Sequence, residues 1–257
     1  MNRPAFLVLL AVLALAAKWA SAQTAPTRLV PFRQGSKWGY ADRTRRLVLP
    51  LHYDEAGPFV GEIAWVRQGQ LYGYIDGGGN PITPVQYTRA ASFQQGRATV
   101  ELQGETFDID VSGHRLTEPA APAPEEEPLE QGDLVRNNGK VGFRFTVGSA
   151  SVPAEYDEIR ENYNGLLFVR QGAKWGIING KGKLVQPLAY DAVRTSGNLV
   201  LPLVQRGGLW GYLDEEGNTL TELRYRQADP FQGDVARVVL PDGQVGYIDA
   251  NGQEFFE

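Results

Sequence analysis

One unit of 34 or 35 residues recurs along this chain, and the repetition limits the fold more than any other feature. The clearest copies are Lys37-Trp38-Gly39, Lys174-Trp175-Gly176 and Leu209-Trp210-Gly211. Positions equivalent to Trp38 fall at residues 72, 106, 141, 175, 210 and 245. A unit this short cannot bury its apolar face alone and has to stack on its neighbours. The spacing therefore predicts seven stacked units.

Short runs of β-branched and aromatic residues fill each unit, separated by Gly, Asn and Asp turns. One unit contains residues 64–68, a turn at Gly69, residues 71–76 and a third run that leads to Pro84 and Tyr87. No segment has an apolar period of 3.6 residues over helical length. The pattern predicts an all-β chain of tandem antiparallel repeats with three strands in each unit. A turn of helix at residues 53–55 and 156–158 remains an alternative.

The Trp-Gly pair is expected to serve packing. Alternate side chains of a strand share a face, so Trp38 and Tyr40 lie on one side and Gly39 on the other. A Gly there lets a neighbouring backbone or ring approach closely. Repetition would produce a buried aromatic row with a glycine-lined groove behind it. The structural signature residues are Trp38, Gly39, Tyr72, Gly73, Trp175, Gly176, Trp210, Gly211 and Gly246.

Ligand stacking by these tryptophans is the alternative, but side chains at a structural period usually form a core. Trp65 lies in a different run and does not recur as Trp. It is the candidate for contact with a partner.

The pattern resembles the bacterial WG-repeat (KWG-type) proteins. The resemblance rests on the three Trp-Gly segments and on downstream Tyr-Asp pairs at 53–54, 156–157 and 190–191, and it covers roughly residues 28–257. Tyr72, Thr106, Val141 and Val245 depart from Trp at the signature position. The resemblance implies an all-β repeat array, often in exported or envelope proteins, with no common enzymatic activity or shared ligand.

An open stacked array is the expected architecture, and a seven-bladed β-propeller-like ring is the alternative. A 34-residue unit is short beside the ~40–45 residues of a four-stranded propeller blade. Residues 29–33 begin a strand of their own, and the chain ends near Phe255-Phe256. Neither terminus is therefore expected to complete the sheet of the other.

Two segments lie outside the repeats. Residues 1–22 read as a signal peptide, with Arg3, an apolar run over 5–17 and an Ala-x-Ala-like cleavage site at 20–22. Residues 118–132 are rich in Pro and Glu and are expected to form a solvated spacer. The expected organisation is thus repeats 1–3 over 28–117 and repeats 4–7 over 133–257. After cleavage we expect no membrane span and a periplasmic or extracellular location.

The amino-acid composition excludes several classes of catalytic and binding site. The chain has no Cys, two His and a net charge of -5, which argues against thiolate catalysis, multi-His metal sites and nucleic-acid binding. Gly77-Gly78-Gly79 lies between strands and does not open a helix, so it is not a phosphate loop. The turn residues Asp76, Asp214 and Asp249 are expected to bond turn amides rather than calcium. We expect no catalytic residue, metal or cofactor.

These features favour a non-enzymatic protein-interaction or scaffold module of the cell envelope, whose partner is an unknown protein or an envelope glycan. The alternative is a carbohydrate- or peptidoglycan-binding module with exposed aromatic residues. A hydrolase with facing carboxylates is less favoured, because Asp54, Asp157 and Asp191 recur whereas a catalytic pair is usually unique.

Overall fold

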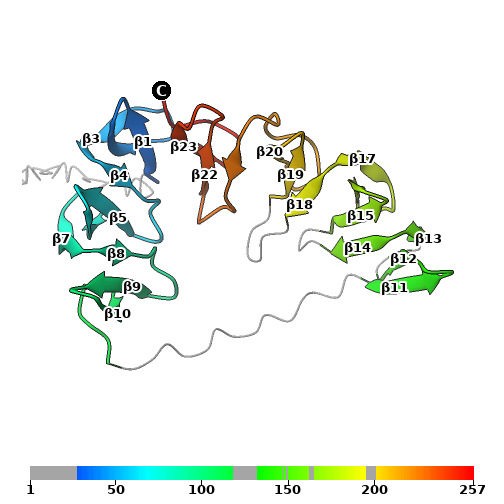
Figure 1. Ribbon diagram of the computed structural model, residues 1–257, viewed down its shortest axis with the longest axis horizontal. Helices are drawn as coiled ribbons and strands as arrows, with labels where there is room; N and C mark the ends of the chain where they lie inside the picture. Colours follow the sequence, from blue (N-terminus) through cyan, green and yellow to red (C-terminus); the bar gives the residue numbers. More distant parts are fainter. Residues whose placement is uncertain (1–27, 118–131, 147, 149, 162–164, 195–200) are drawn as a thin grey trace, which may run out of the picture.

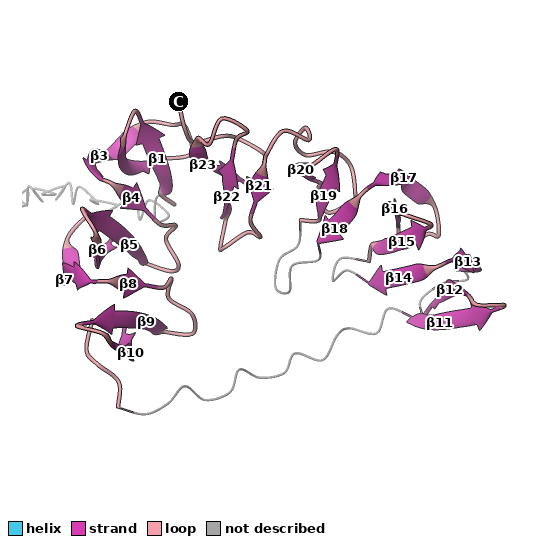
Figure 2. Cartoon of the chain, in the orientation of Figure 1, coloured by secondary structure: helices cyan, strands magenta, loops and turns pink. Residues whose placement is uncertain are grey.

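The chain forms seven small antiparallel sheets (Figure 1). The structure is a computed structural model that describes residues 28–117, 132–146, 148, 150–161, 165–194 and 201–257. The regular secondary structure in these ranges consists of β-strands only, with no helix (Figure 2). The all-β repeat fold predicted from the sequence is confirmed.

We number the sheets in chain order. Sheet 1 contains β1 (Val30–Gln34), β2 (Lys37–Ala41) and β3 (Leu47–Tyr53). Sheet 2 contains β4 (Glu55–Ala56), β5 (Ile63–Gln68), β6 (Leu71–Asp76) and β7 (Pro81–Tyr87). Sheet 3 contains β8 (Arg89–Ala90), β9 (Arg97–Leu102) and β10 (Glu105–Asp110). Sheet 4 contains β11 (Gly132–Asn137), β12 (Lys140–Phe145) and β13 (Ser151–Tyr156).

The remaining sheets follow the same order. Sheet 5 contains β14 (Glu158–Glu161), β15 (Leu167–Gln171), β16 (Lys174–Ile178) and β17 (Leu184–Tyr190). Sheet 6 contains β18 (Ala192–Arg194), β19 (Leu203–Arg206) and β20 (Leu209–Tyr212). Sheet 7 contains β21 (Gln227–Ala228), β22 (Val235–Val239) and β23 (Val245–Asp249).

Sheets 2 and 5 have four strands where three were predicted. We call these, in spatial order, the inner strand, the second strand, the WG strand and the outer strand; in sheet 2 they are β4, β5, β6 and β7. The additional inner strand follows the Tyr-Asp pair directly and is only two residues long in β4. Glu55 and Glu158 begin such strands, so the alternative of a helical turn there is wrong.

The outer strand crosses the WG strand with a shift of register at the signature glycine. In sheet 1, Trp38 pairs with Tyr53 and Tyr40 with Leu49, so the outer strand bulges opposite Gly39. A Cβ atom on Gly39 would lie 2.4 Å from the Leu49 carbonyl oxygen. The predicted close approach is therefore made by backbone, and that backbone fills the space where a glycine-lined groove was expected.

In space the sheets follow the order 4-5-6-7-1-2-3, as an arc that does not close (Figure 1). Strand β1 contacts β23, and Arg33 forms a parallel bridge with Phe256. The Glu257 N–H donates to the Arg33 carbonyl oxygen at 3.3 Å. The expectation that neither terminus completes the other's sheet is thus wrong, because Phe256 and Glu257 cover the edge of β1. Sheets 3 and 4 are the two ends of the arc.

The apolar core is distributed over the contacts between neighbouring sheets, which we call joints. Each of the five buried clusters in the described ranges contains residues of at least two sheets; one, for example, joins Tyr74 of sheet 2 to Phe93 and Val100 of sheet 3. The cluster at sheets 7, 1 and 2 includes Trp38 and Phe255. Each sheet is therefore completed by its neighbour, as a repeat of this length requires.

The predicted signal peptide (1–22) lies outside the described residues, as does all of the predicted spacer except Gly132, the first residue of β11. Among the described residues, no helix has the length and apolar character needed to cross a membrane.

Candidate functional site

The signature indoles are buried and contribute to the joints. Trp38, Trp175 and Trp210 are 4%, 6% and 7% exposed. Trp38 meets Tyr247 of sheet 7 edge-on, with 5.8 Å between ring centroids. Because their faces are covered by protein, these indoles are not available for ligand stacking.

The other signature positions also serve packing. Gly73 and Gly176 lie beneath outer-strand backbone, as Gly39 does. Gly211 lies beneath the backbone of Thr221 and Glu222, which is in no strand, and Gly246 lies beneath the Phe256 ring. Tyr72 is half-buried and packs edge-on against Trp65.

Tyrosines two residues after the signature position tie successive sheets together. The Tyr40 hydroxyl donates to the Gly57 carbonyl oxygen at 2.9 Å, and Tyr74 donates to Ala91 at 2.7 Å. The Tyr212 hydroxyl donates to the main-chain carbonyl oxygen of Asp229 at 2.6 Å. In all three bonds the acceptor lies 17 residues after the tyrosine. Burial raises the pKa of the Tyr212 hydroxyl well above its usual value. These hydroxyls remain protonated donors at neutral pH.

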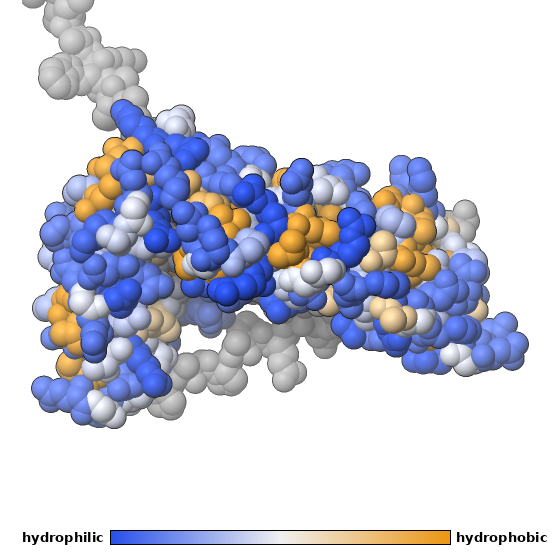
Figure 3. Space-filling model, turned by 45° about the horizontal axis from the view of Figure 1, so that its top comes forward, coloured by the Kyte–Doolittle hydropathy of each residue, from blue (hydrophilic) through white to orange (hydrophobic). Residues whose placement is uncertain are grey.

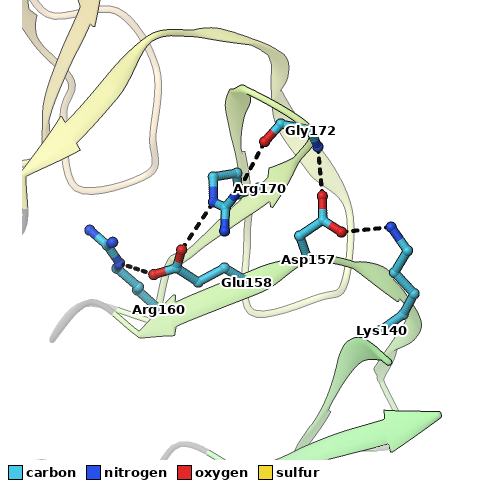
Figure 4. A network of polar contacts seen from close by, with 6 residues as sticks. All are labelled: Lys140, Asp157, Glu158, Arg160, Arg170 and Gly172. Carbon is cyan, nitrogen blue, oxygen red and sulfur yellow. Dashed lines mark hydrogen bonds and ion pairs between the residues drawn. The ribbon is translucent and has the colours of Figure 1, made fainter. Parts of the chain in front are cut away.

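The recurring Asp after Tyr forms a second kind of tie, which we call the aspartate clamp (Figure 4). Lys140 of sheet 4 donates to Asp157 Oδ1 at 2.7 Å, while the Gly172 N–H of sheet 5 donates to Asp157 Oδ2 at 2.6 Å. Asp54 and Asp191 make the same two contacts with the equivalent Lys and turn N–H. One carboxylate therefore links the WG strand of one sheet to the hairpin of the next.

The clamp sets the electrostatics of these carboxylates. The hydrogen bond from Lys140 and then that from Gly172 hold the pKa of Asp157 below its usual value. Lys37 and Gly69 lower the pKa of Asp54 in the same way. An acid catalyst at neutral pH needs a raised pKa instead. The clamp aspartates are thus anionic structural ligands.

Charged side chains on the inner and second strands reinforce sheets 5 and 6. Arg170 donates to Glu158 at 3.0 Å, and Arg160 donates to the other oxygen of that carboxylate at 2.6 Å (Figure 4). The Arg160 guanidinium also lies over the Trp175 ring, 4.5 Å from its centroid. Arg194 covers Trp210 at 4.2 Å. These arginines therefore shield the indoles from water as well as pairing with acids.

The turn aspartates bond backbone amides, as predicted. Asp76 Oδ1 accepts from the N–H groups of Gly78 and Asn80, and Asp214 and Asp249 accept in the same pattern. The Asn80 side-chain amide, which also donates to this carboxylate, and then the backbone N–H bonds lower the pKa of Asp76. No group of three or more His, Asp or Glu residues is placed to hold a metal ion in the parts of the chain that the structure describes.

Two hollows occur where sheets 7, 1 and 2 meet. One, of about 360 Å³, is lined by Arg28, Phe59 and Glu62, among other residues, and Asp234 at its wall pairs with Arg28 and Arg43. The second, of about 150 Å³, lies between Pro58, Trp65 and Tyr247. Trp65 is half-buried, so part of its ring faces solvent. It is the one signature or candidate indole with a surface open to a ligand among the described residues.

The outer face of the arc is mainly hydrophilic. Figure 3 shows apolar patches separated by hydrophilic bands. The larger exposed apolar side chains in the described ranges are dispersed over four sheets and the turn that follows β10: Leu47, Val48, Leu71, Val111, Leu134 and Leu184.

The aspartate clamp was missed by sequence reasoning, although a signal was present. Lys precedes the signature position in the units that carry Asp sixteen residues after it, as in Lys37/Asp54, Lys140/Asp157 and Lys174/Asp191. Leu71 and Leu209 occupy the Lys position where Thr88 and Arg226 replace the Asp. The two positions change together because they form one ion pair.

The sequence matches the model of the family described as "WG containing repeat" at residues 38–72, 72–105, 148–175, 175–200 and 210–242. These segments together span more than half of the chain. No protein with a curated description has a significantly similar sequence.

Several solved structures are weakly similar. The WD40 domain of Pan2 from Neurospora crassa is 13% identical, with a TM-score of 0.35 over 90% of this chain and 88% of that one. BamB from Moraxella catarrhalis is 13% identical, with a TM-score of 0.29 over 89% and 84%. A eukaryotic initiation factor is 11% identical, with a TM-score of 0.33 over 88% and 72%. Scores this low carry no argument, so the fold assignment rests on the seven sheets themselves.

Five matched segments, the buried Trp-Gly pairs and the outer strands that cross them lead to one conclusion: this chain belongs to the WG-repeat family.

Proposed function

We propose that this protein is an exported, non-enzymatic scaffold that acts through protein–protein contacts in the periplasm or outside the cell. One observation carries the proposal: the recurring polar side chains are committed to joints. Asp54, Asp157 and Asp191 each bind a Lys and a turn N–H. The groups that could have served a repeated chemistry are thus used to hold the sheets together.

Non-repeating side chains on a long curved surface are then left for recognition. The sheets follow one another along an arc with a concave side (Figure 2). Stacked repeat arrays offer extended surfaces of this kind to other macromolecules. A scaffold role needs such a surface and needs no catalytic pocket.

Export is supported by the sequence of residues 1–22, with Arg3, the apolar run and the Ala-x-Ala-like site at 20–22. Fractionation of cells that produce the full chain tests it. We expect the protein outside the cytoplasm with Gln23 as its first residue. A cytoplasmic product that retains residue 1 would contradict export.

A glycan-binding role is the second candidate, and it is supported by Trp65 alone. This half-buried indole lines the smaller hollow beside Pro58 and Tyr247. Sugars commonly stack on such a ring, whereas Trp38 and Trp175 are covered.

A paired binding assay separates the two candidates. Purified mature protein is incubated with a solubilised envelope extract and, separately, with isolated peptidoglycan sacculi. We expect a defined protein to be retained and no co-sedimentation with sacculi. Co-sedimentation that Trp65→Ala abolishes, with no protein retained, would establish the glycan role instead.

A further inference from the structure

Sheet 4 differs from the other sheets at the edge of its second strand. In sheets 2, 3, 5, 6 and 7 the second strand pairs with an inner strand. In sheet 1, Phe256 and Glu257 cover β1. Within the described ranges β11 pairs with β12 alone, and sheet 4 begins with β11. No described residue pairs with the other edge of β11.

In sheets 2 and 5, the inner strand and the Asp before it make the same three polar contacts with the second strand and its turn. In sheet 5 the Asp157 N–H donates to the Arg170 carbonyl oxygen at 2.8 Å, and the Gly172 N–H donates to the Asp157 carboxylate. Arg170 also donates to Glu158 at 3.0 Å. Sheet 2 repeats all three contacts with Asp54, Glu55, Arg67 and Gly69. An aliphatic residue follows, Ile159 in one sheet and Ala56 in the other.

Strand β11 presents the same groups. Arg136 pairs with Val141 at the signature position, as Arg170 pairs with Trp175. Asn138 follows the strand as Gly172 follows β15, and its φ of 48° lies in the same left-handed region as the 60° of Gly172. The backbone N–H that holds the aspartate in sheet 5 therefore has a counterpart in Asn138.

The apolar part of this edge is uncovered. Leu134 lies opposite Phe143 and is 45% exposed. Its counterpart Phe168, opposite Ile177, is 0% exposed. Phe168 belongs to a buried cluster with Val204 of sheet 6, so the exposure of Leu134 marks apolar surface beside β11 that the neighbouring sheet leaves uncovered.

We propose that this edge of β11 binds an extended segment of a partner protein with the sequence Asp-Glu-aliphatic, added as an antiparallel strand. Arg136 and the Asn138 N–H would receive the two carboxylates, and the Arg136 carbonyl oxygen would accept the Asp N–H. This inference rests on the proposed role in protein binding and specifies its partner. Strand addition of this type takes affinity from main-chain hydrogen bonds and specificity from side chains.

The test uses the full mature chain and a fluorescent peptide, Glu-Tyr-Asp-Glu-Ile-Arg, which copies residues 155–160. We expect a saturable rise in fluorescence anisotropy. Arg136→Ala should weaken binding by about tenfold or more, because a charge-assisted hydrogen bond is lost. Replacing the peptide Asp-Glu by Asn-Gln should have an effect at least as large.

Arg144→Ala is the matched control, since Arg144 is an exposed arginine on the adjacent strand β12. Its affinity should stay within about twofold of the parent value. No saturable binding, equal losses in Arg136→Ala and Arg144→Ala, or a homodimer that the peptide dissociates would overturn the proposal; the last result would place a second copy on this edge.

The two proposals fail separately. If Arg136→Ala retains the envelope protein as well as the parent does, the edge is not its binding site, but the scaffold role stands. If the peptide binds through Arg136 and no envelope protein is retained, the edge stands and the scaffold role does not.

Discussion

At the scale of single residues, the crossing outer strand leaves almost no room for a side chain at the signature glycine. A Cβ on Gly142 would lie 2.5 Å from the Val152 carbonyl oxygen, on a strand that cannot retreat without leaving its sheet. The sequence predicted a close approach at these glycines from their place between bulky neighbours. It could not show that backbone fills the space, because that depends on a bulge in a different strand.

We predict that Gly39→Ala destabilises the fold by about 1–3 kcal/mol through overpacking. The added methyl would meet the Leu49 and Pro50 carbonyl oxygens. Gly77→Ala is the control, because a Cβ there meets nothing closer than Glu62 Oε2 at 3.6 Å. Urea denaturation of both variants measures the effect, and equal midpoints would contradict the backbone crossing.

Trp175 gives the corresponding test of the buried indole row. Trp175→Ala should cost more than about 3 kcal/mol, as truncation of a core aromatic residue does. Trp65→Ala should cost less, since Trp65 is half-buried. An unchanged denaturation midpoint for Trp175→Ala would remove this indole from the core.

At the scale of elements, sequence reasoning found the longer strands and missed the inner ones. Runs such as 63–68 carry enough β-branched and aromatic residues to be recognised. The inner strand β4 has two residues, too few to show any period. What marks its position is the Tyr-Asp pair before it, whose Asp bonds to two different sheets. Such a tie is invisible when each unit is considered alone.

The aspartate clamp makes the joints sensitive to acid. The pKa of Asp157 is lower when folded than when unfolded, so its contribution to stability is present above the unfolded pKa of about 3.9. That contribution is lost as the pH falls through the folded value. We predict that Asp157→Asn is less stable than the parent at pH 7 and that the difference disappears in acid.

Denaturation curves of parent and Asp157→Asn from pH 7 to pH 2 measure this dependence. Glu216→Gln, a change in an exposed turn of sheet 6, should leave the parent curve nearly unchanged. A stability difference for Asp157→Asn that stays constant in acid would contradict the clamp.

At the scale of the whole molecule, the sequence predicted an open array but not its order. Phe256 lies eleven residues after the signature position Val245, whereas Tyr53 lies fifteen after Trp38. The spacing after the signature position is therefore shorter in the last unit, so an alignment of the units does not place Phe256-Glu257 opposite the Tyr-Asp pairs. In the structure Glu257 nevertheless donates to Arg33 as Asp54 donates to Arg67. The joint of sheets 7 and 1 thus keeps this main-chain hydrogen bond, although Phe256 bridges Arg33 in parallel where β4 pairs antiparallel with β5.

The central claim is that sheet 7 stacks on sheet 1 and places both ends of the array at sheets 3 and 4. Gln34 and Glu257 form a side-chain hydrogen bond of 2.9 Å across this joint, and the chain has no native Cys. Cysteines introduced as Gln34→Cys with Glu257→Cys can therefore be joined by a short bifunctional reagent and identified by mass spectrometry.

The matched control is Gln171→Cys with Glu257→Cys, because Gln171 holds in sheet 5 the position that Gln34 holds in sheet 1. We predict rapid intramolecular linkage of positions 34 and 257 and none of 171 and 257. Equal linkage of both pairs, or linkage of neither, would contradict the stacking of sheet 7 on sheet 1.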